Sequence, residues 1–154
     1  MKKRKKAEKK QKAVSKKLVE KAGLAIKNEF YLEASWILSS IMEKKLKNLL
    51  DKLENQKPGA GFSLEQSIKR VKFLHLTSKH PLLILHYKIS FIDELRNWKN
   101  QRNTVMKDML AVHVSKARME RLALDGIRLL KELNAANKKF KSGIITTDLT
   151  NTQP

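Results

Sequence analysis

Helical spacing of apolar residues runs through most of the chain and restricts its fold more than any other feature. In residues 30–54, FYLEASWILSSIMEKKLKNLLDKLE, apolar side chains recur at mixed spacings of three and four residues. This spacing places them on one face of a helix of about 3.6 residues per turn. No segment shows the alternation of apolar and polar residues between hairpin turns that is typical of strands. The sequence therefore predicts an all-α protein.

Loop and helix-start signals divide the next part of the chain. Residues 55–61, NQKPGAG, contain a proline and two glycines, which predict a loop. Ser63 and Gln66 fit the S-x-x-Q capping box, in which each side chain bonds the backbone N–H of the other residue, so a second helix is expected to begin here. Pro81 suits the first turn of a third helix, because its missing N–H is not needed there.

The third helix is expected to continue from about residue 82 into the segment 95–110, since neither proline nor glycine interrupts it. A last helix is expected over about residues 115–141. It contains Gly126, which costs about 1 kcal/mol relative to alanine within a helix, and we expect two helices to approach closely there. Four or five helices with short connections predict an antiparallel bundle.

The charge of the chain is strongly basic, with a formal net charge of +19. Residues 1–21 contain 11 Lys and Arg against 2 acidic residues, so +9 lies in this segment and +10 in residues 22–154. Such an excess predicts a polyanionic partner, and nucleic acid in particular. For residues 1–21, a polyanion-binding arm and a solubilising tail both remain possible interpretations.

The distribution of apolar residues suggests three parts. Residues 1–21 have few apolar side chains and are expected to form a basic, mobile tail, as coil or fraying helix. Residues 22–141 are expected to form the helical bundle domain. Residues 142–154, SGIITTDLTNTQP, are expected to form a disordered C-terminal end.

Several kinds of chemistry lack their sequence signals. The chain has no cysteine, which excludes disulfides, thiolate zinc sites and a cysteine nucleophile. It has no glycine-rich phosphate loop, no HExxH and no EF-hand loop. The histidines show no metal-ligand spacing with one another or with a nearby carboxylate; they are His75, His80, His86 and His113. We therefore expect neither a metal site nor a cofactor.

The basic N-terminal run is not followed by the apolar stretch or the cleavage pattern of a secretory signal. The longest uninterrupted apolar run, residues 82–85, is far shorter than the roughly 18 residues that suggest a membrane span. We therefore expect a cytoplasmic protein without a membrane partner.

Arg102 interrupts the apolar stripe of the expected third helix, which consists of Phe91, Leu95, Trp98, Val105 and Met109. A guanidinium stays charged, and burying it is costly unless it is paired or hydrogen-bonded. One interpretation is a structural arginine whose stem packs beside Trp98 while its head reaches the edge of the bundle or an acid such as Glu94 or Glu120. A second is an arginine in a cleft between two subunits, where a nucleic-acid phosphate would satisfy it. A third is a different helical phase.

The stretch WKNQRNTVMKDML resembles the signature of the HEPN (higher eukaryotes and prokaryotes nucleotide-binding) superfamily. In this family a helix carries an arginine and a polar residue, often with an aromatic residue one turn earlier, and a histidine follows. Trp98, Arg102 and Asn103 match this pattern, and the order of expected helices is similar over about residues 28–141. The resemblance implies an HEPN-like bundle whose motif helices pair across a twofold dimer.

The chain departs from the family at the histidine. Lysine, aspartate and methionine occupy residues 107–109, where the histidine would stand, and His113 is the first histidine after Arg102. In active members the arginine and the polar residue hold the scissile RNA phosphate, and the histidine handles the proton of the 2′-hydroxyl without a metal. The resemblance therefore implies phosphate binding at Arg102 and Asn103, with His113 as a weak catalytic candidate.

Together these observations predict an RNA- or other nucleic-acid-binding HEPN-like bundle without efficient catalysis. The expected binding residues are Arg96, Lys99, Arg102, Asn103 and Lys107. Aromatic residues are few, so we expect backbone contacts with little base readout. We also expect a homodimer packed along the 91–109 stripe.

Two alternatives remain open. One is a structural or regulatory helical module that binds a protein partner, as in toxin–antitoxin pairs, with a tail that serves solubility. The other is an active, metal-independent endoribonuclease.

Overall fold

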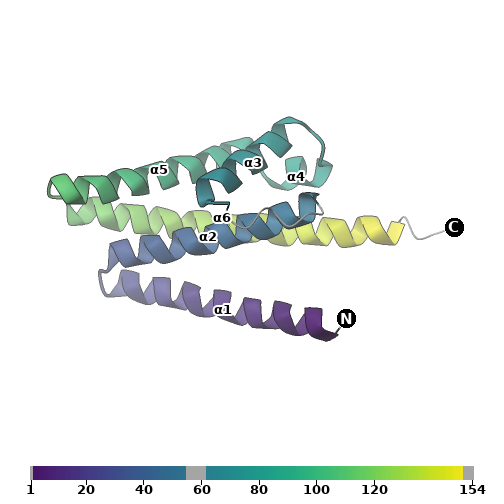
Figure 1. Cartoon of the computed structure of the whole chain (residues 1–154), viewed down its shortest axis with the longest axis horizontal. Helices are drawn as coiled ribbons and strands as arrows, with labels where there is room; N and C mark the ends of the chain where they lie inside the picture. The colour runs from purple at the N-terminus through teal and green to yellow at the C-terminus, as the bar shows by residue number, and fades with distance from the viewer. Residues whose placement is uncertain (1, 55–61, 151–154) are drawn as a thin grey trace.

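The computed structural model describes residues 2–54 and 62–150, so the loop predicted at residues 55–61 lies outside the described part of the chain. Within the described residues the chain forms six helices and no strand (Figure 1). The helices are α1 (Lys2–Lys27), α2 (Tyr31–Glu54), α3 (Leu64–Leu76), α4 (Pro81–His86), α5 (Ile89–Ala111) and α6 (Lys116–Thr150). The predicted all-α bundle is confirmed.

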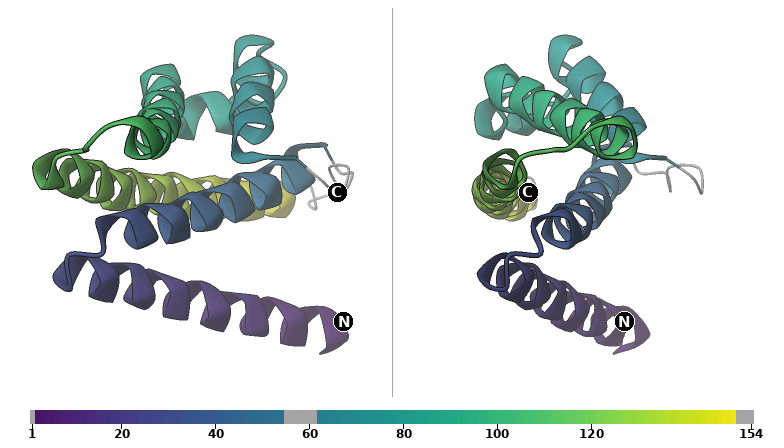
Figure 2. Two further views of the ribbon diagram at one scale, coloured as in Figure 1. Left: turned by 60° about the vertical axis from the view of Figure 1, so that its left-hand side comes forward. Right: turned by 90° about the vertical axis from the view of Figure 1, so that its left-hand side faces the viewer.

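The two long helices α2 and α6 lie side by side in the middle of the molecule (Figures 1 and 2). Helix α1 packs on the outer side of α2, and α3, α4 and α5 cover the opposite side of the α2–α6 pair. Helices α1 and α2 are antiparallel, as are α5 and α6, whereas α2 and α6 run in the same direction. One surface of α5 thus lies next to α2 and the start of α3, two elements that precede it by many residues in the sequence.

The predicted apolar faces form the core. Large side chains that are almost completely buried come from α2, α3, α5 and α6, and they include Leu38, Met42, Leu46, Leu50, Ile68, Leu95, Leu129 and Leu133. Removing these apolar side chains from water is the main favourable contribution to folding.

Local signals at the helix ends are confirmed. The Ser63 side chain accepts a hydrogen bond from the Gln66 N–H at 3.3 Å, and the Gln66 Oε1 accepts one from the Ser63 N–H at 2.8 Å. Pro81 occupies the first turn of α4. The expected close approach at Gly126 is present, because an added Cβ would lie 2.8 Å from Trp98 Cζ2 and 3.0 Å from Leu38 Cδ1.

The prediction of one continuous third helix is wrong, because the structure has two helices there, α4 and α5. The chain leaves the helical conformation at Tyr87 and Lys88, which have extended backbone angles and separate α4 from α5. Tyr87 is buried, its ring meets Phe140 edge-on at 6.2 Å between centroids, and its hydroxyl donates to Asn137 Oδ1 at 2.7 Å. These contacts with α6 favour the extended conformation over continued helix.

The predicted boundaries at both ends of the bundle also change. Helix α1 includes residues 2–21, and Leu18 and Val19 pack against the core. Helix α6 continues to Thr150, beyond the helix end expected at about residue 141, and Ile144 packs against the core. No helix in the described part of the chain combines the length and the apolar character needed to cross a membrane.

Candidate nucleic-acid interface

A hollow of about 320 Å³ lies where the middle of α5 meets α2 and the start of α3. It is lined by Ser39, Glu43, Ser63, Leu64, Glu65, Lys99, Arg102 and Asn103. Three of the five predicted binding residues are therefore brought together here. We call this site the basic hollow.

Arg102 is partly buried at the basic hollow. Its guanidinium carbon lies 5.4 Å from the centroid of the Trp36 ring on α2, a distance typical of a cation–π contact. Its buried Nε has no hydrogen-bond partner among the described residues. Burial lowers the pKa of Arg102, although an arginine remains charged at neutral pH. The side chain thus offers a partly desolvated positive charge with unused hydrogen-bonding capacity.

Glu43 is the acidic residue that acts on Arg102. Its charge opposes the effect of burial on the pKa of Arg102, but the two side chains form no ion pair. Both Glu43 oxygens have other donors: Oε1 accepts from Lys47 Nζ at 2.7 Å, and Oε2 accepts from the Leu64 N–H at 3.1 Å. Glu43 therefore stabilises the start of α3 and leaves the Arg102 guanidinium without a direct carboxylate partner within the described chain.

Glu65 is the second carboxylate of the hollow. It accepts a 2.6 Å hydrogen bond from Lys99 Nζ and lies 3.2 Å from Lys69 Nζ and 4.0 Å from Arg96 Nε. The hydrogen bond from Lys99 is the main reason that the pKa of Glu65 lies below its usual value. The lining holds two cations, Lys99 and Arg102, against the two carboxylates. The excess of positive charge comes from cations that contact these carboxylates from outside the lining; they are Lys47, Lys69 and Arg96.

Two residues of the predicted site lie apart from the hollow. Lys107 is exposed further along α5, and it does not line the hollow. His113 is exposed in the connection between α5 and α6, and it does not line the hollow either. Arg96 is exposed and reaches the site only through Glu65.

Glu94 and Glu120, the acids suggested for a structural Arg102, form no ion pair with it in the described chain. Glu94 accepts instead from Arg128, at 2.9 Å. Trp98 is buried, and its indole N–H donates to the Leu122 carbonyl at 2.8 Å. The aromatic partner of Arg102 is Trp36, which no pattern in the sequence pointed to.

The expected dimer surface also needs correction. Phe91, Leu95, Trp98 and Val105 are buried within a single chain, where they pack in the core. Met109 alone of the predicted stripe is exposed. The 91–105 part of the stripe is therefore not available as an interface, while the homodimer itself stays a prediction.

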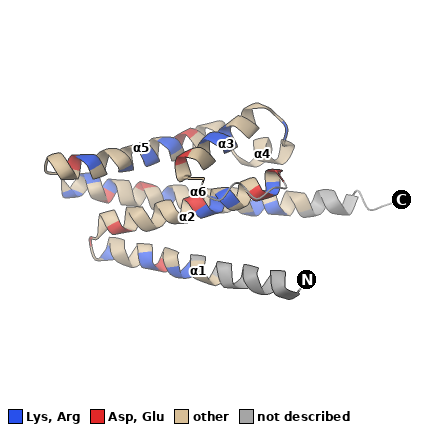
Figure 3. Ribbon diagram, viewed as in Figure 1, with Lys and Arg blue, Asp and Glu red and all other residues tan. Residues whose placement is uncertain are grey.

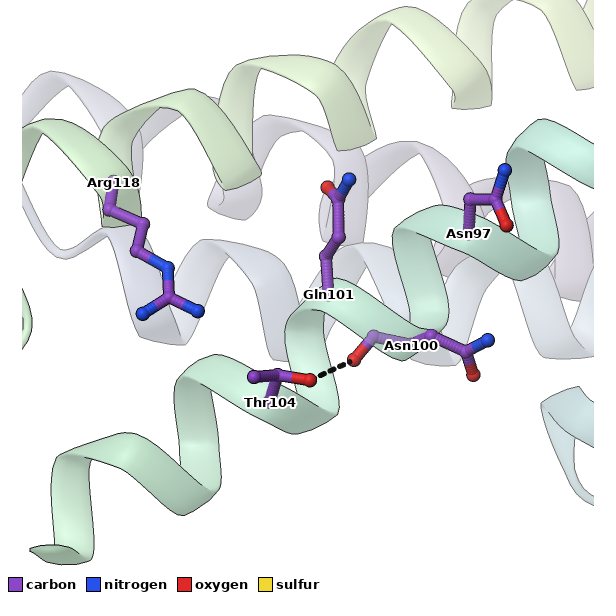
Figure 4. Close-up of a pocket in the computed structure, with 5 residues that line it drawn as sticks. All are labelled: Asn97, Asn100, Gln101, Thr104 and Arg118. Carbon is purple, nitrogen blue, oxygen red and sulfur yellow. Dashed lines mark hydrogen bonds between the residues drawn. The ribbon is translucent and has the colours of Figure 1, made fainter.

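A second hollow, of about 340 Å³, lies on another face of α5 (Figure 4). Its lining residues are Asn97, Asn100, Gln101, Thr104 and Arg118. The Arg118 guanidinium extends from α6 towards α5, and its Nη1 pairs with Asp108 Oδ2 at 2.6 Å. This hollow is polar, but its single lining cation is already neutralised, so it is a weaker candidate for phosphate.

Lys and Arg residues are also spread along the coloured parts of the long helices, with fewer Asp and Glu residues among them (Figure 3). No group of three or more His, Cys, Asp or Glu side chains in the described residues is arranged to hold a metal ion.

Comparison of the chain with protein-family models, curated proteins and solved structures found no match. The structure itself defines the class: a basic helical bundle with a hollow beside α5 that Lys99 and Arg102 line.

The charge arrangement at Glu65 predicts a pH dependence of stability. A carboxylate whose folded pKa is lowered contributes stability that is fully present above its unfolded pKa, about 4.3, and that is lost as the pH falls through its folded pKa. When the pH falls below about 4.3, we therefore expect the free energy of unfolding of the wild-type chain to decrease more than that of Glu65→Gln. Urea denaturation at a series of pH values measures both. Equal losses in the two proteins would contradict the assigned Lys99–Glu65 contact.

Proposed function

We propose that this protein binds nucleic acid, with RNA favoured, and that a backbone phosphate is held at Arg102 in the basic hollow. The observation that carries the proposal is the state of Arg102: partly desolvated, held against Trp36 and without an ion-pair partner among the described residues. The Nε atom is buried, so a phosphate would bind the two Nη groups at the outer end of the guanidinium, and charge-assisted hydrogen bonds to arginine are strong.

The neighbours of Arg102 suit the same ligand. Lys99 is held at the hollow by Glu65 and leaves 18% of its side chain exposed. Asn103 adds a carboxamide that donates hydrogen bonds, and Ser39 and Ser63 add hydroxyl groups. The excess of positive charge around the hollow and over the whole chain supports attraction of a polyanion.

Binding without efficient cleavage is the form of this function that the site supports best. A general base works best when its pKa lies near the operating pH. No histidine lines the described hollow, and Lys99 keeps the pKa of Glu65 low, which makes this carboxylate a poor base. Metal-independent RNA cleavage that His113→Ala abolishes would instead favour the endoribonuclease alternative.

Arg102→Ala is expected to weaken RNA binding by roughly tenfold or more, since hydrogen bonds to charged groups contribute about 1.5–3 kcal/mol. It should also reduce the slope of log K against log salt by about one. Arg102→Lys should restore the salt slope more fully than the affinity, because lysine keeps the charge but loses the two-pronged donor geometry. Fluorescence anisotropy with a labelled RNA across a salt series measures both quantities.

The matched control is Arg70→Ala. Arg70 also stacks on an aromatic ring, that of Phe73 at 5.3 Å, but it is ion-paired with Glu54 and does not line the hollow. This variant should leave affinity nearly unchanged. Equal losses for Arg102→Ala and Arg70→Ala would mean that binding follows net charge alone and would overturn the proposed site.

A second control separates the hollow from the basic N-terminal segment. Replacing the Lys and Arg residues of segment 2–12 with glutamine removes the positive charge of this segment but keeps residues that favour a helix. RNA binding that persists and still depends on Arg102 supports the proposal. Loss of RNA binding in this variant would mean that the N-terminal segment alone binds RNA, and it would favour the protein-interaction alternative.

One observation favours that alternative function. Three apolar side chains near the end of α5 are left exposed: Met109, Leu110 and Val112, with Leu110 92% exposed. A cluster of this kind is a common feature of protein-binding surfaces. A folded Leu110→Ser, Val112→Ser variant that loses a protein partner while retaining RNA affinity would support it.

A further inference from the structure

Trp36 is unusual among the large aromatic side chains of α2 because it is exposed in the body of the helix. It is 57% exposed, whereas Trp98, the other tryptophan, is 2% exposed. Trp36 makes no contribution to the buried core clusters. Its ring is therefore accessible to a ligand.

Its place on the helix connects Trp36 with the basic hollow. Ser39 and Glu43 follow it by three and seven residues, so all three side chains lie on nearly the same face of α2, and the latter two line the hollow. The Arg102 guanidinium lies over the Trp36 ring at 5.4 Å. The indole of Trp36 thus lies next to Arg102 of the hollow and exposes apolar surface to solvent.

We propose that Trp36 is a stacking platform for an unpaired nucleobase, while Arg102, Lys99 and Asn103 hold the adjoining phosphate. This inference rests on the proposed nucleic-acid function and specifies its ligand: single-stranded rather than duplex nucleic acid. An aromatic face beside a cationic groove is the arrangement by which proteins bind single strands with little dependence on sequence.

The preference for a single strand follows from access to the base. In a duplex, both faces of each base are covered by its neighbours in the stack, so a side chain reaches a face only where bases are splayed out. The Arg102 contact also restricts the Trp36 ring before ligand binds, which lowers the conformational entropy lost on stacking.

The Arg70–Phe73 pair provides an internal comparison. Its geometry is similar, with 5.3 Å between the guanidinium carbon and the ring centroid, and Phe73 is also about half exposed. Arg70, however, is ion-paired with Glu54, and neither residue lines the basic hollow, whereas Arg102 of the other pair lines it. A stacking site beside a phosphate requires both an accessible ring and a cation without a direct ion pair, and only the Trp36 pair combines them among the two cation–π pairs of the described chain.

The test uses the full-length protein with three probes: a short single-stranded oligoadenylate, a duplex RNA of the same length, and inorganic polyphosphate. Wild-type protein should bind the single strand more tightly than the duplex, with quenching of tryptophan fluorescence. Trp36→Leu should weaken single-strand binding by roughly 5- to 100-fold, the range expected for loss of one base–aromatic stack. Trp36→Phe should recover much of the affinity, and Phe73→Leu should have no effect.

Polyphosphate carries the charge of a nucleic-acid backbone but no bases, so Trp36→Leu should leave its affinity unchanged. Two results would overturn the stacking platform and leave the proposed function standing, provided that binding still depends on Arg102. One is an equal single-strand affinity in wild-type protein and Trp36→Leu. The other is single-strand binding that is no tighter than duplex binding. A wild-type chain that binds none of the three probes would overturn both.

Discussion

Replacing Trp98 with alanine is expected to lower the free energy of unfolding by about 3–5 kcal/mol. The ring is buried between α5 and α6, and its N–H donates to the Leu122 carbonyl. The substitution removes apolar contacts, leaves a cavity that the surrounding helices fill only in part, and deletes this hydrogen bond. Since small domains are stable by about 5–15 kcal/mol, urea denaturation followed by circular dichroism should register a large shift of the midpoint.

Trp36→Ala is the matched control for this experiment. It removes the same type of side chain, but from a position that is largely exposed, so we expect a loss below about 1 kcal/mol. Similar losses for the two variants would mean that Trp36 belongs to the core. A small loss for Trp36→Ala would also show that the Trp36 variants of the stacking test remain folded.

The sequence predicted those parts of the fold that depend on neighbours along the chain. The buried face of α2 follows from apolar spacing, because residues three and four apart share a face of any helix. The capping box at Ser63 involves residues three apart, and it is present as predicted. The close approach at Gly126 was expected because glycine is unfavourable within a helix unless another element needs the space.

Features that depend on distant residues could not be predicted in this way. The break between α4 and α5 accompanies contacts of Tyr87 with Asn137 and Phe140 on α6, and no proline or glycine marks it. Similarly, the helical wheel of α5 placed Arg102 beside Trp98 of its own helix. The observed aromatic partner is Trp36 on α2, and periodicity identifies a buried face without identifying what packs against it.

The position of Arg102 on an apolar stripe has a structural explanation. Trp98 and Val105, before and after it on α5, are buried in the core, whereas Arg102 lies at the edge of the stripe where the basic hollow opens. Its stem is partly buried there, and its charged end contacts an exposed ring. The residue that broke the pattern in the sequence is therefore the residue that marks the candidate site.

Gly126→Val is expected to destabilise the protein by about 1–3 kcal/mol, the usual cost of adding volume to a packed core. The new Cβ would lie 2.8 Å from Trp98 Cζ2 and 3.0 Å from Leu38 Cδ1. The Trp98 ring cannot yield easily, because it is buried and its N–H is hydrogen-bonded to Leu122 of the same helix that carries the glycine. Gly23→Ala is the control: no atom lies within 4 Å of its added Cβ, and alanine should stabilise α1 by about 0.5–1 kcal/mol.

A double-mutant cycle distinguishes this steric conflict from a general effect on α6. Trp98→Phe shortens the ring that the new side chain would meet, so Gly126→Ala should cost less in the Trp98→Phe background than in the wild-type chain. A coupling energy of about 0.5–3 kcal/mol is typical of residues in contact. Purely additive changes in the free energy of unfolding would show that Gly126 and Trp98 do not touch, and the close approach of α5 and α6 behind the basic hollow would then be wrong.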